Sequence, residues 1–192
     1  MNISAMAIGN HEFDWGIDVL KARIRQADFT FVAANIYRKN RCRERRICQY
    51  IDCFFCDRIP PLHPAWARPF IIERVNGYKV AVIVLATPDT SSVTNPIHVE
   101  HLEFTDPVVA VNKIMPRVMW RNPDLVVVLA HIGGYWPEFA EGIMDLNCGL
   151  DPEQVDLIVS GHTHSRIDDV MCDIPVVQSY SINTRRPSTY MI

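Results

Sequence analysis

The stretch ISAMAIGNHEFDWG, residues 3–16, joins a short apolar run to a group of polar side chains. The apolar part, residues 3–8, is typical of a buried strand, and Gly9 interrupts it. Four polar or titratable residues follow: Asn10, His11, Glu12 and Asp14. Such side chains at the carboxyl end of a buried strand indicate a ligand site in an open α/β sheet. Taken alone, they fit an ordinary strand-to-helix turn better, with Asn and Asp as turn and cap residues.

Two further apolar runs end in histidine, and they change that interpretation. DLVVVLAH ends in His131, and VDLIVSGHTH ends in His162 and His164. Parallel neighbours bring their carboxyl ends to one edge of a sheet, so we expect these histidines to converge with Asn10. His162 and His164 are two residues apart, which in extended backbone places both imidazoles on the same side.

The composition sets broad limits on the class of protein. The chain has 192 residues, 48% of them hydrophobic, which fits one domain with a substantial core. A formal net charge of −3 gives no general attraction to a nucleic acid polymer or an anionic membrane. No apolar run reaches the length of a membrane span, and no secretory signal pattern opens the sequence. The cellular compartment stays open.

The six cysteines are unevenly distributed along the chain. Four of them lie in one short segment: Cys42, Cys48, Cys53 and Cys56. They fit a zinc cluster, disulfides or free thiols, and only the last pair has the C-x2-C spacing of a zinc knuckle. Cys148 and Cys172 lie apart from this cluster and from each other.

Alternating strand and helix patterns predict an α/β fold. We expect strands at about residues 3–8, 29–34, 79–86, 124–130 and 155–160, with a final strand from residue 174. Helical segments are expected at residues 16–27, 108–115 and 137–146, where Asp106-Pro107 supplies a helix start. Asn76-Gly77 predicts a hairpin turn, and Pro116 is expected to end or kink its helix. Residues 38–69 form an irregular excursion rich in Cys, Arg and Pro.

The candidate ligands favour transition-metal chemistry. Imidazoles with an amide oxygen suit Zn²⁺, Mn²⁺ or Fe²⁺ better than Ca²⁺ or Mg²⁺, which prefer oxygen ligands. The sequence contains neither the G-x-S-x-G motif of serine hydrolases nor a P-loop. These observations leave metal-assisted hydrolysis, in which a metal-bound hydroxide attacks an electrophilic centre.

Four motifs together resemble the calcineurin-like metallophosphoesterases, and most closely their 5′-nucleotidase branch: GNHEFDWG, TPDT…NP, LAHIGG and DLIVSGHTHS. The resemblance implies a partial four-layer α/β/β/α sandwich, a small-molecule phosphate ester such as a nucleotide as substrate, and two divalent ions (Mn, Zn or Fe). It covers nearly the whole chain outside the Cys-rich excursion.

The resemblance also implies roles for single residues. Asn10, His131 and His162 would bind one metal ion, and His164 would bind the other. His11 would face the scissile phosphate and stabilise or protonate the leaving oxygen. Asp14 would hold the His11 ring by a hydrogen bond and favour its charged form. Glu12 is expected to be structural, His63 matches no ligand position, and His98 and His101 are expected at the surface.

Two family motifs are absent from the sequence. Relatives carry an Asp-x-His strand end and a Gly-Asp whose carboxylate bridges the metals, and neither occurs here. We therefore expect residues 1–192 to be one partial metallophosphatase domain, truncated at its N-terminus and without the substrate-binding C-terminal domain. Two hypotheses follow. One is a 5′-nucleotidase-type phosphoesterase, with a 2′,3′-cyclic nucleotide phosphodiesterase or nucleotide-sugar hydrolase as alternatives within that class. The other is a catalytically incomplete metal-binding fragment that needs the missing ligands.

Overall fold

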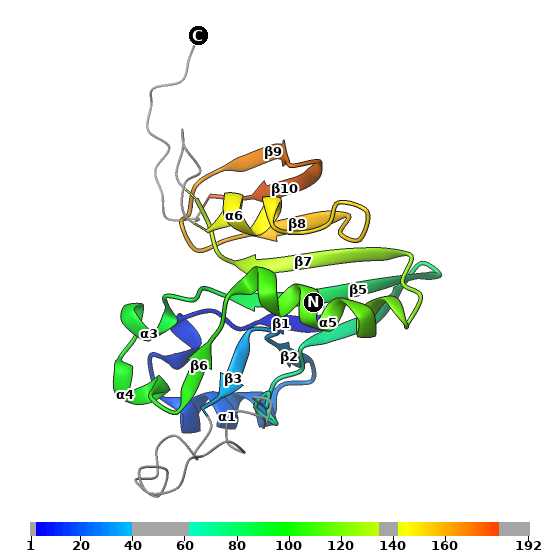
Figure 1. Ribbon diagram of the computed structural model, residues 1–192. Helices are drawn as coiled ribbons and strands as arrows, with labels where there is room; N and C mark the ends of the chain where they lie inside the picture. The colour runs from blue at the N-terminus through cyan, green and yellow to red at the C-terminus, as the bar shows by residue number, and fades with distance from the viewer. Residues whose placement is uncertain (1–2, 40–61, 135–141, 181–192) are drawn as a thin grey trace, which may run out of the picture.

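The computed structural model describes residues 3–39, 62–134 and 142–180, and the arrangement of its elements is shown in Figure 1. The elements follow in chain order: β1 (Ala5–Ala7), η1 (His11–Phe13), α1 (Ile17–Gln26), β2 (Thr30–Val32), β3 (Ile36–Arg38), β4 (Phe70–Val75), β5 (Tyr78–Ala86), α3 (Thr90–Val93), α4 (Pro96–Val99), β6 (Leu102–Phe104), α5 (Pro107–Met119), β7 (Leu125–His131), α6 (Ile143–Cys148), β8 (Leu157–Ser160), β9 (Ile167–Met171) and β10 (Ile174–Gln178).

The largest sheet has six strands in the order β4-β5-β7-β8-β10-β9. Its four central strands run parallel, so the carboxyl ends of β5, β7 and β8 lie at one edge. The two outer strands, β4 and β9, are antiparallel to their neighbours. A parallel pair, β1-β2, and an antiparallel pair, β3-β6, form two smaller sheets.

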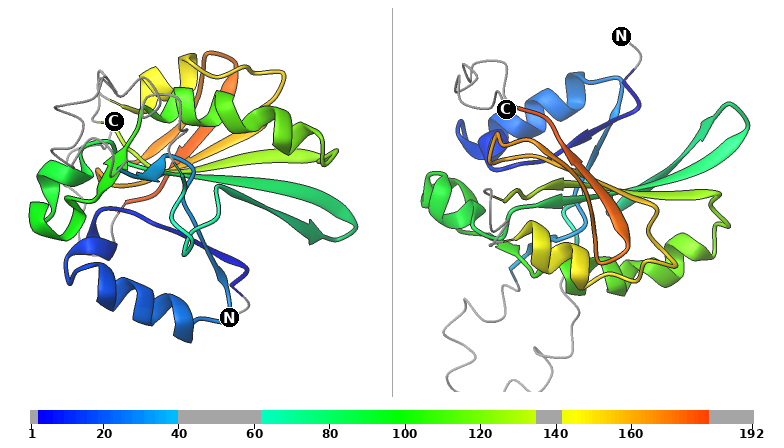
Figure 2. Two further views of the ribbon diagram at one scale, coloured as in Figure 1. Left: turned by 60° about the horizontal axis from the view of Figure 1, so that its bottom comes forward. Right: turned by 90° about the horizontal axis from the view of Figure 1, so that it is seen from above.

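The elements stack in four layers, as Figure 2 shows. Helices α5 and α6 cover one face of the large sheet, while β1 and β2 cover the other, with α1 outside them. Because both faces of the large sheet are covered, the side chains of β7 alternate between two buried environments. Val126, Val128 and Ala130 belong to the core beneath the helices, while Leu129 packs on the opposite face with residues of β1. The predicted α/β/β/α sandwich is confirmed.

Local sequence signals explain several elements. Asn76 and Gly77 both have positive φ, as a tight hairpin between β4 and β5 requires. The Asp106 side chain accepts a hydrogen bond from the Val109 amide at the start of α5, where Pro107 is the first helical residue. The five expected strands are present as β1, β2, β5, β7 and β8, mostly with slightly shorter bounds.

Other expectations about secondary structure were wrong or incomplete. Pro116 does not end α5, which continues to Met119, because losing one amide donor near a helix end is tolerated when the buried face continues through Val118. Helix α6 begins at Ile143, and residues 135–141 lie outside the described residues. Strand β9 was not expected, since its sequence, IDDVM, does not alternate. The Cys42–Cys56 cluster lies outside the described residues.

Asn35 is fully buried and ties the end of β5 to the strands beneath it. Its side-chain amide donates to the Ala86 carbonyl at 2.8 Å and to the Thr105 carbonyl at 3.1 Å. Its side-chain oxygen accepts from the Ala86 amide at 2.9 Å. One polar side chain thus joins three chain segments beside the carboxyl edge of the large sheet.

A disulfide joins Cys148, at the end of α6, to Cys172, in the turn between β9 and β10. This pairing was not predicted from the sequence, in which 24 residues separate the two cysteines. The bridged segment contains β8 and the Gly-His-Thr-His loop after it. The disulfide therefore closes a covalent ring around two of the candidate metal ligands.

Asn35→Ala should lower the free energy of unfolding by about 2–4 kcal/mol, because it leaves the Ala86 amide and two carbonyls without partners. Urea unfolding followed by circular dichroism measures this. Asn95→Ala is the matched control, since it removes one exposed cap bond to the Ile97 amide and should cost about 1 kcal/mol. Equal losses in the two variants would contradict the role given to Asn35.

The double variant Cys148→Ser/Cys172→Ser should be about 3 kcal/mol less stable than the parent, because the disulfide restricts the unfolded chain. Reducing agent should destabilise the parent by a similar amount and the double variant much less. Thermal unfolding of both proteins, with and without the reductant, gives the comparison. A parent melting temperature that does not change on reduction would argue against this bridge.

Candidate functional site

The carboxyl ends of β1 and β7 meet at Gly9. A Cβ added to Gly9 would lie 2.7 Å from Cδ2 of the His131 ring, closer than real Cβ atoms come to other heavy atoms. Only glycine therefore lets the chain pass this ring and place Asn10 beside it. Asn10 is 2% exposed although it is polar, so its environment must supply a partner.

Three of the candidate ligands converge. Asn10 Oδ1 lies 2.9 Å from His131 Nε2, and His162 Nδ1 lies 3.3 Å from the same nitrogen. The rings of His131 and His162 have centroids 5.0 Å apart and an interplanar angle of 60°. The structure thus brings together three side chains from the ends of three different segments, although 121 residues separate Asn10 from His131.

The loop after β8 departs from the extended backbone that the sequence analysis assumed. His162 and His164 have φ values of 76° and 56°, in the left-handed region that non-glycine residues rarely adopt. The two imidazoles are therefore placed by this unusual backbone, and the alternation of an extended strand does not apply. His164 is exposed and makes no hydrogen bond with Asn10, His131 or His162. Backbone strain of this kind is concentrated at functional sites.

Gln178 holds the strained loop in place. Its side-chain amide donates to Thr163 Oγ1 and to the Ser165 carbonyl, both at 2.9 Å. Its side-chain oxygen accepts from Ser160 Oγ at 2.6 Å. Gln178 is 4% exposed and lies at the end of β10, next to β8 in the sheet. The sequence analysis missed it, because a glutamine after an apolar run carries no signal of its own.

Glycines allow the neighbouring loop to approach. A Cβ on Gly133 would overlap Thr163 Oγ1 and the Gly161 carbonyl, so the loop after β7 and the loop after β8 are in backbone contact. The hydroxyls of Thr163 and Ser165 both donate to the Gly134 carbonyl, at 3.0 and 2.8 Å. The Gly-Gly pair of LAHIGG therefore fits the Gly-His-Thr-His loop against the end of β7.

His11 and Asp14 form a pair at the rim of this site. His11 Nδ1 lies 2.8 Å from Asp14 Oδ2, and Thr94 Oγ1 donates to the other carboxylate oxygen at 3.1 Å. The hydrogen bond to His11 is the main reason why the pKa of Asp14 is lowered. The His11 side chain is 74% exposed, so it is accessible to a ligand. Glu12 instead accepts the Gly9 amide at 2.7 Å, consistent with a structural role.

Two other histidines are structural. His98 is half-buried, and its Nδ1 lies 2.9 Å from the Phe13 carbonyl, so the expectation of a surface residue was wrong. That bond ties α4 to the turn that carries His11. His63 Nδ1 lies 3.1 Å from the Ile36 carbonyl, and its ring packs on Tyr37. Neither residue approaches the converging ligands.

Burial keeps the central imidazoles neutral. It lowers the pKa of His131 to about 4, and the neighbouring imidazoles of His162, His11 and His164 add to the effect. Burial is also the main reason why the pKa of His162 is lowered, an effect that the Asp89 carboxylate partly opposes. Neutral imidazole is the form that binds metal ions. Asp89 immediately precedes α3, and its charge reaches this site.

The geometry of the three donors suits a metal ion. Ligands bound at about 2.1 Å lie about 3.0 Å apart in octahedral and about 3.4 Å apart in tetrahedral coordination. The separations of 2.9 and 3.3 Å about His131 Nε2 match those values. Within residues 3–39, 62–134 and 142–180, no three His, Cys, Asp or Glu side chains are grouped to hold a metal ion. The amide oxygen of Asn10 is therefore the third donor beside the two imidazoles.

Comparisons with known proteins show relatives across most of the chain. A 5′-nucleotidase of Vibrio parahaemolyticus is 32% identical over 168 residues, covering 85% of this chain and 26% of the relative. Protein UshA of Yersinia enterocolitica is 29% identical over 168 residues, covering 85% of this chain and 27% of its own length. The crystal structure of the calcineurin-like phosphoesterase YfkN from Bacillus subtilis superposes with a TM-score of 0.70 at 24% identity, covering 94% of this chain and 55% of that one.

No family model matches the chain. The relatives are 5′-nucleotidases and UshA proteins, and the fold is that of the calcineurin-like phosphoesterases. The chain spans about a quarter of the length of these curated relatives. In the part of the chain that the structure describes, no helix has the length and apolar character needed to cross a membrane.

The free energy of unfolding of the metal-free protein should fall between about pH 6.5 and pH 4. In that range the unfolded chain protonates His131 while the folded chain does not, so lowering the pH favours unfolding. The share of this single residue is about 3 kcal/mol. Urea unfolding at a series of pH values in the presence of a chelator measures the slope.

His131→Gln is the control for this titration, since it keeps a polar side chain and removes the ionisable ring. Its stability should depend less steeply on pH over the same range. Asp14 does not interfere, because its lowered pKa places its contribution below about pH 3.8, where stability is lost as the carboxylate protonates. Identical slopes for the parent and His131→Gln would show that His131 is not held neutral.

Proposed function

We propose that this chain is a metal-dependent phosphoesterase of the 5′-nucleotidase type, acting on nucleoside monophosphates or related phosphate esters. One observation carries the proposal: Asn10, His131 and His162 converge within 3.3 Å at the carboxyl edge of a phosphoesterase fold. The names of the relatives support the substrate class, since several are 5′-nucleotidases. A 2′,3′-cyclic nucleotide or a nucleotide sugar is the alternative substrate within the same reaction class.

Four residues are proposed to hold divalent ions, Mn²⁺, Zn²⁺ or Fe²⁺. Asn10, His131 and His162 would bind one ion, and the exposed His164 would contribute to a second. When bound, such ions activate water and stabilise negative charge on a phosphoryl group. Burial keeps His131 neutral, and the side-chain oxygen of Asn10 lies 2.9 Å from Nε2, the ring nitrogen that would bind the ion.

His11 is proposed to act on the substrate. Its ring is exposed at the rim of the site, and its Nδ1 is fixed by Asp14. Fixing Nδ1 leaves Nε2 to face a phosphate oxygen. His11 would therefore stabilise the developing charge on the leaving oxygen and donate a proton to it. Thr94 keeps Asp14 in place by binding its second oxygen.

A second candidate function is metal binding without efficient turnover. It is favoured by the finding that the described residues contain no group of three His, Cys, Asp or Glu suited to a metal ion. Without a bridging carboxylate, the spacing of two ions has no fixed support. Misplacing a reacting group by about 1 Å can lower the rate about a hundredfold. The chain would then need carboxylate ligands from elsewhere to be an active enzyme.

The metal site is tested by isothermal titration of Mn²⁺ or Zn²⁺ into the chelator-treated protein. His162→Ala should lower the affinity at least about tenfold, because it removes one of three converging ligands. His11→Ala should leave the affinity nearly unchanged, since His11 is proposed to serve the substrate. His63→Ala is the matched control, a half-buried histidine outside the site. Unchanged metal affinity in His162→Ala would disprove the ligand assignment.

Phosphate release from AMP in the presence of Mn²⁺ distinguishes the two candidate functions. The phosphoesterase is supported if the parent releases phosphate, His131→Ala abolishes this turnover and His11→Ala lowers it about a hundredfold. Metal binding that depends on His162 without measurable turnover would support the incomplete site. Turnover that survives in His131→Ala would contradict both.

A further inference from the structure

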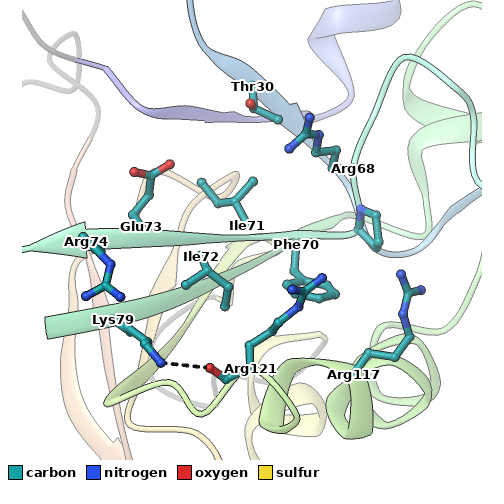
Figure 3. Close-up of a pocket in the computed structure, with 11 residues that line it drawn as sticks. Thr30, Arg68, Phe70, Ile71, Ile72, Glu73, Arg74, Lys79, Arg117 and Arg121 are labelled. Atoms are coloured by element: carbon teal, nitrogen blue, oxygen red, sulfur yellow. Dashed lines mark hydrogen bonds between the residues drawn. The ribbon is translucent and has the colours of Figure 1, made fainter.

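A pocket of about 760 Å³ lies along β4, the edge strand of the six-stranded sheet (Figure 3). Five cationic residues line it: Arg68, Arg74, Lys79, Arg117 and Arg121. Glu73 is the only carboxylate among its lining residues. Strand β5 runs from Lys79 in this pocket to Ala86 beside His131, about 23 Å away at 3.3 Å per residue. The Lys79 end of the pocket is therefore distant from the candidate metal site, and none of the lining residues is a candidate metal ligand.

The cations are concentrated on one side of β4. Phe70 and Ile72 pack with the core beneath α5, whereas Ile71 packs on the opposite face, toward β1 and β2. By the same alternation Arg74 lies on the α5 side. Lys79 is its cross-strand partner on β5 and lies on the same face. Arg117, in the last turn of α5, and Arg121, in the turn that follows the helix, extend toward the same side, as Figure 3 shows. Four positive charges thus gather on the α5 side of β4. On the opposite side, the positive charge of Arg68 and the negative charge of Glu73 roughly cancel.

This accumulation of charge opposes the stability of the free protein. Like charges directly across a strand pair, such as Arg74 and Lys79, are destabilising, and Arg117 and Arg121 line the same pocket with two more positive charges. Within the described parts of the chain, none of the four forms an ion pair with a carboxylate. An anionic ligand would relieve this repulsion.

The outer edge of β4 also has free backbone groups. The tight turn makes Val75 and Tyr78 a hydrogen-bonded pair, and such pairs alternate along an antiparallel ladder. Phe70, Ile72 and Arg74 therefore direct their amide and carbonyl groups away from β5. No other strand in the described residues pairs with β4 on that side. The edge can accept one more strand.

We propose that β4 and this basic pocket bind an extended acidic segment of a partner protein, which adds to the sheet as an edge strand. Side chains of an added strand alternate between the two faces. Acidic residues at alternate positions would meet the four cations on the α5 side, and neutral residues between them would face Ile71 and Thr30. A second copy of this chain is a poor occupant, because it would bring the same positive charges. The proposal is independent of the proposed phosphoesterase activity.

The probe is a fluorescein-labelled peptide of alternating glutamate and valine, and binding is followed by fluorescence anisotropy at low salt. Arg117→Ala/Arg121→Ala should weaken binding at least about tenfold, because it removes two of the four charges. Arg23→Ala/Arg25→Ala is the matched control, since it removes two exposed helical arginines outside the pocket and should leave the affinity unchanged. The same peptide with N-methylated backbone amides should bind at least about tenfold more weakly, because it keeps its charge and loses strand pairing.

Three outcomes would overturn the proposal. The first is the absence of peptide binding. The second is an equal loss of affinity in the two double variants, which would indicate unspecific attraction between opposite charges. The third is equal binding of the N-methylated peptide together with competition by inorganic tripolyphosphate, which would make the pocket a site for small anions.

Discussion

The contact between Gly9 and the ring of His131 is the constraint on which the site depends. No side chain fits at Gly9, because a Cβ would come within 2.7 Å of the imidazole. This close approach seats the β1-β2 layer directly on β7, and it turns the backbone so that Asn10 meets His131 Nε2. Asn35 reinforces the same edge by joining the end of β5 to the neighbouring segments. The two inner layers of the sandwich are therefore aligned at the point where the candidate ligands gather.

The site has a base, formed by His131 and the loop that carries His162, and an exposed rim at His11. His131 is half-buried and its pKa is lowered to about 4, so it stays neutral at physiological pH. The loop that carries His162 has left-handed backbone, and Gln178 and the Gly133 contact hold it in that conformation. His11 lies outside this base, where it is exposed and paired with Asp14. The site therefore has neutral imidazoles at its base and an exposed imidazole at its rim.

Much of the fold could be predicted from the sequence, and the failures have identifiable causes. The hairpin at Asn76-Gly77 and the start of α5 depend on local backbone chemistry, so their residues are sufficient to predict them. The continuation of α5 past Pro116 could not be predicted, because tertiary burial of its apolar face outweighs the lost hydrogen bond. The Cys148–Cys172 disulfide is also a tertiary fact, since pairing depends on which turns the sheet order brings together.

For the candidate site, the sequence by itself determined which residues stand at the strand ends: Asn10, His131, His162 and His164 follow apolar runs whose parallel alignment can be inferred. Only the tertiary structure decided their geometry. The positive φ of His162 and the contribution of Gln178 arise from contacts between segments distant in the chain. The basic pocket along β4 was equally invisible, because Arg74 and Arg121 become neighbours only when α5 packs on the sheet. Local rules fix what a segment prefers, whereas packing fixes which segments meet and in what orientation.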